Sequence, residues 1–435
     1  MMVNDNSRFF NSPAREEEAS EVMTRSPEHA HGPECAPPEV EASSAVRMKG
    51  YHCLEGRPAF KLALRRAGER WLLYLAHLWH RGWSILDVTD PAAPEMVNFI
   101  PGPEGMWTIQ IQVAEDLMLT ALEVPPQGWG VAPAESAEPP EEGCLIWSLE
   151  DPTAPKVAGL YRASGGTHRN YYAGGNLAFM ASSAEDAHGR LLTTVDVSDP
   201  SSPRKVGRWG WPSQWRSSGE AQLDSYMHGP AYVLGDRAYA SYGRAGAVIL
   251  DVGNPADPQL ISRVSLGDLG SRIGCHSAVP YKNEQLLLIN GEAIGEGRSG
   301  EWNYAVIADI SDVEAPRVIG ALPTPRPPNG VSYFDRGGRF GPHNQHHQQG
   351  QGHLFGNEEI VFMTWFNAGL RVFDISDPFD PFERGFFVPD PPRFRRGPLP
   401  STLAVQFEDV LVDARGNIYC TDKNHGLFVL EMDSA

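Results

Sequence analysis

Hydrophobic and polar residues alternate in short runs along most of this 435-residue chain, and turns rich in Gly, Pro, Asp and Asn separate the runs. Alternation with a period of two is typical of β-strands that have one buried face. The sequence contains 44 Gly and 37 Pro, which indicates many turns and few long helices. The pattern therefore predicts an all-β protein.

One pattern of about twelve residues recurs among these runs. It consists of a short apolar run, an Asp, another apolar residue and then Asp-Pro, two residues and Pro, as in WSILDVTDPAAP from Trp83. Further copies begin at Cys144, Leu191, Ala247, Tyr304 and Leu370, and a truncated copy, GLFVLEM, begins at Gly426. A spacing of roughly fifty to sixty residues is typical of propeller blades.

Each full copy of the pattern lies between further apolar runs. Pro lacks the N–H group that a β-ladder requires, so the Asp-Pro segment is expected to connect the third and fourth strands of a unit. Four strands in each of seven units predict a seven-bladed β-propeller with four-stranded antiparallel blades. The seventh unit ends after its third strand, and we expect the apolar segment 45–54 to close this last blade as an N-terminal strand. One propeller should therefore span residues 45–435, preceded by a disordered or loosely attached N-terminal arm over residues 1–44.

The repeated pattern L-x-I-x-D-x-S-D-P-x-x-P resembles the LVIVD repeat family of β-propellers over about residues 45–433. Three copies depart from it, with Ser148 in place of the first Asp, Gly253-Asn254 in place of Ser-Asp, and Val313 in place of the first Pro. These changes lie in or beside a turn. The resemblance implies the fold and says little about chemistry, because propellers carry many unrelated functions.

Composition excludes several classes of function. The formal net charge of −19 argues against general binding to nucleic acid or to anionic lipid. No run reaches eighteen apolar residues, and the N-terminus has no apolar signal region, so neither membrane insertion nor secretion is expected. The five Cys are scattered and form no disulfide framework or CxxC pair. Reduced thiols and a cytoplasmic location are the resulting expectations.

The histidines give the strongest functional signal. When the blades are aligned on the turn between their first two strands, four successive blades place a His at the start of the innermost strand. These residues are His168, His228, His276 and His343. Blade six has a longer hairpin, so His346 or His347 could replace His343. Equivalent positions of a propeller meet at its axis, and we therefore predict a metal site formed by the four imidazoles, which suit first-row metals.

Other candidate residues surround the predicted metal site. Blade seven places Glu408 at the equivalent inner position, where a carboxylate could hold a ligand's second ring nitrogen or bind the metal. Loops between second and third strands add His80 and His425, and we regard these three residues as candidate catalytic groups. Long loops before blades four, six and seven, with Trp211 among their residues, are expected to cover the site and select the substrate.

These features favour a metal-dependent enzyme that acts on a small molecule. The four-His geometry, rather than the sequence, is similar to the site of carotenoid-cleavage oxygenases. This similarity implies a non-haem Fe(II) oxygenase that uses O2 and a small unsaturated or aromatic substrate. Mn, Cu and Zn also suit such ligands. Two alternatives stay open: a non-redox lyase, hydratase or hydrolase that uses Mn or Zn, and a non-catalytic propeller that serves as a binding scaffold.

Overall fold

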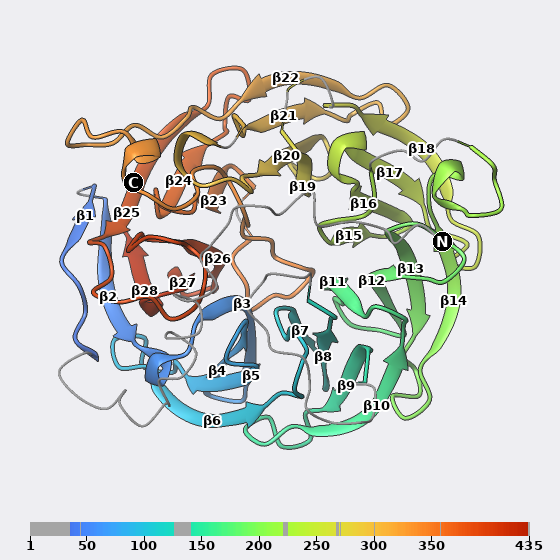
Figure 1. Cartoon of the computed structure of the whole chain (residues 1–435), viewed down its shortest axis with the longest axis horizontal. Coiled ribbons are helices and arrows are strands. Elements are labelled where there is room, and N and C mark those ends of the chain that lie inside the picture. Colours follow the sequence, from blue (N-terminus) through green and yellow to red (C-terminus); the bar gives the residue numbers. More distant parts are fainter. Residues whose placement is uncertain are drawn as a thin grey trace.

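The computed structural model describes residues 35–43, 45–125, 141–220, 225–266, 269, 271–299, 301–356 and 358–433. Within these ranges the strands form seven four-stranded antiparallel sheets, which surround a central axis as blades (Figure 1). The predicted seven-bladed β-propeller is therefore confirmed. None of the helices in the described ranges is long and apolar enough to span a membrane.

In the first five blades, the strands run in chain order from the axis to the rim. Blade one contains β3 (Ala59–Ala67), β4 (Arg70–His77), β5 (Gly82–Asp87) and β6 (Glu95–Pro101), and blade two contains β7 (Ile111–Ala114), β8 (Leu117–Leu122), β9 (Gly143–Ser148) and β10 (Lys156–Arg162). Blade three contains β11 (Thr167–Tyr171), β12 (Leu177–Ser183), β13 (Arg190–Asp196) and β14 (Arg204–Trp209). Blade four contains β15 (Ala231–Leu234), β16 (Arg237–Ser241), β17 (Ala247–Asp251) and β18 (Gln259–Val264), and blade five contains β19 (Ile273–Tyr281), β20 (Leu286–Glu292), β21 (Ala305–Asp309) and β22 (Arg317–Ala321).

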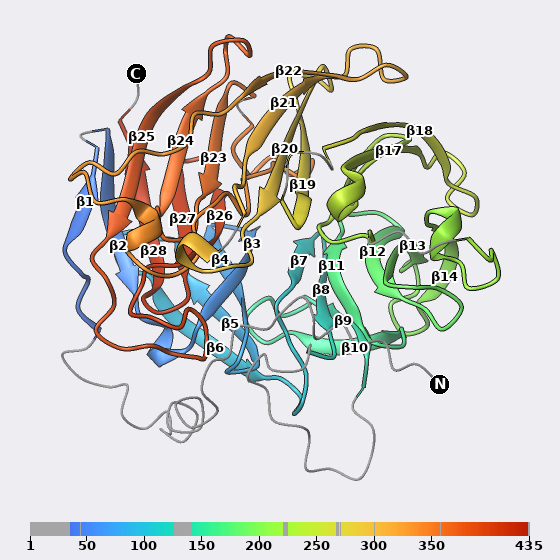
Figure 2. The same ribbon diagram turned by 45° about the horizontal axis from the view of Figure 1, so that its top comes forward.

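The last two blades each include a strand from the N-terminal part of the chain (Figure 2). Blade six contains β23 (Ile360–Thr364), β24 (Leu370–Asp374), β25 (Phe382–Pro389) and β1 (Val40–Ala42), and blade seven contains β26 (Phe407–Val412), β27 (Asn417–Asp422), β28 (Gly426–Met432) and β2 (Val46–His52). The innermost position of blade six is taken by the extended segment 343–346, which pairs irregularly with β23 through His343 and His346. Short 3-10 helices occur at Leu54–Gly56, Pro212–Gln214, Gly243–Ala245, Gly297–Ser299 and Tyr333–Asp335.

The ring is closed by the N-terminal strand β2, as the sequence predicts. β2 pairs antiparallel with β28, from Val46 opposite Met432 to His52 opposite Leu427. The predicted loose arm is described only from residue 35 onward. Its final part is attached to the propeller, because Val40–Ala42 forms β1 and pairs with the outer edge of β25.

The sequence predicted that all five cysteines are free thiols, and the structure differs for two of them. Cys35 and Cys53 form a disulfide, with Cα atoms 5.3 Å apart, a separation within the usual range for such bonds. The expectation is wrong for this pair because the fold brings the arm back to the start of blade one, a contact that spacing in the sequence cannot show. The other three, Cys144, Cys275 and Cys420, are free and buried.

The repeated Asp residues act as turn formers. In blade one, Asp87 Oδ1 accepts a hydrogen bond from the Thr89 amide at 2.9 Å, and Asp90 Oδ1 accepts one from the Ala92 amide at 3.0 Å. Asx turns of this kind replace ladder hydrogen bonds between the third and fourth strands. Where the pattern departs from Asp, Ser148 Oγ accepts the equivalent bond from Glu150 at 3.3 Å. The motif is therefore a turn signal, and the departures keep the turn.

Adjacent blades come close where a glycine lies in the outermost strand. A Cβ added at Gly207 would lie 2.2 Å from the backbone oxygen of Pro255, in the Asn-Pro turn of the next blade. Gly50 on β2 makes the same approach to Pro91 of blade one. The N-terminal strand thus makes the contact between blades that the fourth strands of other blades make.

The innermost strands share an irregularity at their first residues. The register between first and second strands shifts in blades one, three, five and seven, between Ala59 and Leu62, Thr167 and Asn170, Ile273 and Ser277, and Phe407 and Asp409. Such bulges redirect side chains and are common beside functional sites. The residues in these bulges include His168, His276 and Glu408.

Candidate metal centre

The four histidines predicted from the sequence converge at the propeller axis. His168 and His276 lie in bulges at the starts of β11 and β19, whereas His228 and His343 precede strands and bond to Ser241 and Thr364 through their backbones. The ring centroids lie 5.0 Å apart between His168 and His228, 5.3 Å between His228 and His276, and 4.6 Å between His276 and His343. All four side chains are buried.

In three of these rings, Nδ1 has a partner away from the cluster. His168 Nδ1 lies 2.6 Å from Glu123 Oε2, His276 Nδ1 lies 2.8 Å from Ser277 Oγ, and His343 Nδ1 lies 2.8 Å from the backbone oxygen of Glu408. A ring nitrogen that donates to a carboxylate or backbone oxygen leaves the other nitrogen with a lone pair, as in His168 and His343. In His276, Arg169 donates to Nε2, so that nitrogen also has a lone pair. Nε2 is thus the nitrogen available to a metal in His168, His276 and His343.

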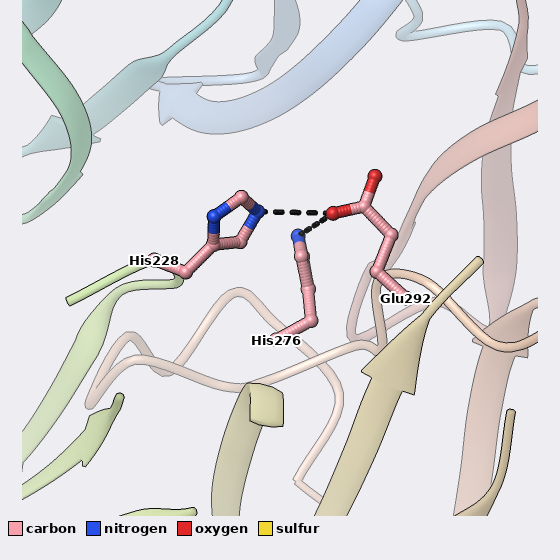
Figure 3. Close-up of side chains that lie close together, drawn as sticks. All are labelled: His228, His276 and Glu292. Carbon is pink, nitrogen blue, oxygen red and sulfur yellow. Dashed lines mark hydrogen bonds and ion pairs between the residues drawn. The ribbon is translucent and has the colours of Figure 1, made fainter. Parts of the chain in front are cut away.

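Glu292, the last residue of β20, places its carboxylate among the rings. His228 Nε2 lies 2.9 Å from Oε2 of Glu292, and His276 Nε2 lies 3.9 Å from the same oxygen (Figure 3). The other oxygen, Oε1, lies 3.8 Å from His343 Nε2 and 2.9 Å from an Arg339 guanidinium nitrogen. His228, His276 and Glu292 offer ligand atoms that all lie within 4.8 Å of one another.

The donor atoms of this cluster fit a transition metal. His168 Nε2 and His343 Nε2 are buried and have no hydrogen-bond partner among the described residues. Burial holds the pKa of His168, His276 and His343 well below the ordinary value, so these rings are neutral at pH 7 and keep the lone pair that a metal requires. Burial favours the protonated form of Glu292, but the hydrogen bond that His228 Nε2 donates to its carboxylate opposes this and holds the pKa of Glu292 well below the usual range.

Charged residues form pairs around the cluster. Arg190 lies 2.8 Å from Glu123, Arg339 lies 2.9 Å from Glu292, Lys423 lies 2.9 Å from Glu408, and Lys61 lies 2.6 Å from Asp409. Burial raises the pKa of Glu123 to about 7, although Arg190 opposes this shift. Arg339 comes from the long loop that precedes blade six, so this loop reaches the site as the sequence suggested.

Of the three candidate catalytic residues, only Glu408 lies beside the histidines. Its Oε2 is 3.2 Å from His343 Nδ1, but that nitrogen makes its hydrogen bond to the backbone oxygen of Glu408 at 2.8 Å, so the backbone rather than the carboxylate supports this ring. His80 instead lies near Arg396, and burial lowers its pKa to about 4. His425 Nε2 lies 2.9 Å from the backbone oxygen of Asp390. The function proposed below gives His80 and His425 no role.

The structure also separates the three histidines of blade six. His346 uses both ring nitrogens, with Nδ1 3.1 Å from the Val412 amide and Nε2 2.8 Å from the Phe355 oxygen. His347 packs against Tyr232, with ring centroids 4.6 Å apart. His343 is therefore the residue that blade six brings to the cluster.

Trp211 packs in the protein rather than over the site. Its ring centroid lies 5.2 Å from that of Trp209 and 6.4 Å from that of Tyr242, and the Arg263 guanidinium lies 5.4 Å from its centroid. The side chain is partly buried against the core. The lid role expected for this residue has no support in these contacts.

Replacing Trp211 with Ala should lower the free energy of unfolding by about 2 kcal/mol. This is less than the loss expected when a fully buried Trp is replaced with Ala, because the Trp211 indole is only partly buried. Denaturant unfolding measures this effect. Affinity for substrate should stay unchanged. Altered affinity at unchanged stability would restore the lid interpretation.

Several residues of the site were not singled out by the sequence. Glu123 follows β8 and Glu292 ends β20, so both carboxylates come from the end of a second strand. Arg169 and Arg339 reach the site through a bulge and a long loop. Strand alternation does not predict where the side chains of Arg169 and Arg339 point. The two Glu residues could have been found, because both lie at the end of the second strand of a blade.

Comparison with known proteins supports the fold. The LVIVD repeat family matches residues 174–209 and 232–265. The β-propeller domain of Cps50 (Swd1) from Myceliophteria thermophila is similar at a TM-score of 0.51 and 10% identity, covering 91% of this chain and 100% of that domain. YCF48, in a structure bound to D1 peptide, is similar at a TM-score of 0.52 and 7% identity, covering 92% of this chain and 100% of that chain. A search of curated proteins finds no significant match. The chain is a seven-bladed β-propeller that contains LVIVD repeats at residues 174–209 and 232–265.

Proposed function

We propose that this propeller is a mononuclear metal-dependent enzyme with its metal centre at the axis. The ligands would be the carboxylate of Glu292 and the Nε2 atoms of the histidine cluster, and His228 would release the proton that its Nε2 donates to Glu292 before that nitrogen binds the ion. The ligand residues of the cluster are His168, His228, His276 and His343. The observation that carries the proposal is the buried convergence of these rings, two of which have Nε2 atoms without hydrogen-bond partners in the described part of the chain.

We further propose that the metal is Fe(II) and that the reaction is an oxygenation of a small unsaturated or aromatic molecule. The proposed ligands include His228, His276 and Glu292, which offer imidazole and carboxylate donors of the kinds that bind Fe(II) in many non-haem oxygenases. Bound iron would supply the redox chemistry that O2 activation requires. The residues of this chain would hold the ion, keep the site dry and orient the substrate.

A non-redox lyase or hydrolase that uses Mn or Zn is the second candidate, and Lys423 favours it. Its Nζ lies 2.9 Å from Glu408 Oε1, 5.7 Å from the centre of the Phe60 ring and 5.1 Å from that of Trp79. Burial lowers the pKa of Lys423 to about 8, although Glu408 opposes the shift. A lysine in this range can transfer a proton near neutral pH.

Elemental analysis of the full-length protein, purified without a metal-affinity tag, tests the proposal. We expect one equivalent of a first-row metal per chain, removable by chelation, and O2 uptake with unsaturated or aromatic substrates. Metal without O2 uptake would favour the non-redox candidate. Metal no higher than in the chelated protein would refute both. In that case a binding scaffold, the use suggested by the peptide-bound YCF48 structure, would replace them.

A further inference from the structure

Arg169 is a buried guanidinium that lacks an ionic partner. It follows His168 in the bulge of β11, and only 3% of its surface is exposed. Its hydrogen bonds are long, 3.4 Å to Gln110 Oε1 and 3.5 Å to His276 Nε2, and its Nε has no hydrogen-bond partner among the described residues. Within those residues no carboxylate forms a salt bridge with it.

The neighbouring cations show how unusual this is. Arg190, Arg339, Lys423 and Lys61 each lie within 2.9 Å of a carboxylate oxygen. Their partners are the four acidic side chains around the cluster, so none of these carboxylates is left to form a salt bridge with Arg169. If His276 Nε2 binds a metal, Arg169 also loses one of its two acceptors.

An unpaired buried charge is costly, and a guanidinium offers five N–H donors in a planar array. Two parallel N–H groups match the two oxygens of a carboxylate. A carboxylate would also supply the negative charge that Arg169 lacks. The missing partner therefore has the properties of a carboxylate.

Apolar residues lie on the side of Arg169 that faces blades one and two. The Arg169 guanidinium lies 5.2 Å from the centre of the Phe60 ring, which in turn lies 6.0 Å from the His343 ring. Phe60 packs with Leu78, Trp107 and Ile109 in one buried cluster. Blades one and two thus present apolar side chains near the starts of their innermost strands, where the next four blades present histidines.

We propose that Arg169 binds the carboxylate of the substrate and that the substrate is an aromatic or unsaturated carboxylate with its apolar part against Phe60. This inference rests on the proposed metal-dependent function. It assigns the substrate class of the same site. In this proposal Arg169 contacts the substrate itself, because its guanidinium forms no salt bridge with another side chain in the described ranges. It is therefore a substrate-binding residue.

Calorimetric titration of the full chain tests this assignment. The probes are benzoate, phenylacetate, trans-cinnamate and hexanoate, each compared with its uncharged amide. At least one carboxylate should bind about tenfold or more tightly than its amide, the size expected for hydrogen bonds to a charged group. Arg169→Gln should abolish this preference, and Arg169→Lys should restore part of it. Arg208→Gln, which removes an arginine 2.8 Å from Asp186 at the surface, is the control and should keep the preference.

Thermal unfolding and metal content separate this role from a structural one. Because the charge of Arg169 is unpaired, Arg169→Gln should melt no lower than the wild type and should retain its metal. The inference is overturned if no carboxylate binds more tightly than its amide, if the Gln variant keeps the preference, or if phenyl phosphate binds more tightly than benzoate. Carboxylate binding can be measured with or without the ion. Absence of metal would therefore refute the proposed metal-dependent function, while the titration would still decide whether Arg169 binds carboxylates.

Discussion

Replacing His276 with Ala should reduce metal affinity by more than about 100-fold and abolish metal-dependent activity, while the propeller stays folded. The effect should exceed the 10–100-fold typical of residues that only support a ligand, because His276 is itself a proposed ligand. Its ring lies between those of His228 and His343, at 5.3 and 4.6 Å, and its Nε2 lies 3.9 Å from Glu292. Metal titration followed by elemental analysis measures the loss, and thermal unfolding checks the fold.

His347→Ala is the matched control for this experiment. His347 is partly buried and follows His343 by four residues, but it packs against Tyr232 instead of joining the cluster. The control should keep its metal. Retention of wild-type metal by His276→Ala, or equal loss in both variants, would show that the four rings do not hold an ion.

The fold was predictable because the repeated segment encodes a local structure. Each Asp-Pro segment combines a residue that forms an Asx turn with one that cannot continue a ladder, so a copy marks a strand end wherever it occurs. Ser148 and Asn254 keep the turn with other side-chain oxygens, which is why the departures did no harm. The truncated last copy also indicated that a strand from elsewhere must complete blade seven.

The convergence of the four histidines was predictable from the repeat, whereas the residues that surround them were not. Equivalent positions in a propeller meet at the axis, so register alone brings His168, His228, His276 and His343 together. Arg169 points to the axis because of a bulge, which breaks the two-residue period.

Contacts made by irregular segments were also beyond the sequence pattern. Arg339 and Trp211 lie in long loops that have no repeat to align. The Cys35–Cys53 disulfide depends on the path of the arm.

Removing β2 should have the largest effect on stability. A chain that begins at residue 53 lacks the ladder from Val46 to His52 and exposes the edge of β28, whose residues Leu427–Leu430 are buried. It also loses the contact between Gly50 and Pro91 that joins blades seven and one. Loss of Val46 and the partly buried Met48 and Tyr51 should lower the free energy of unfolding by on the order of 5 kcal/mol.

A chain that begins at residue 45 provides the comparison, because it lacks β1 and Cys35 equally but retains β2. Thermal unfolding of the two chains therefore isolates the closing strand. We expect the shorter chain to melt at least about 5 °C below the longer one, or to aggregate through the exposed edge of β28. The reason for this expectation is that a closed propeller cannot lose the outer strand of one blade without exposing the buried face beneath it. Equal melting temperatures would mean that the ring does not depend on its N-terminal strand.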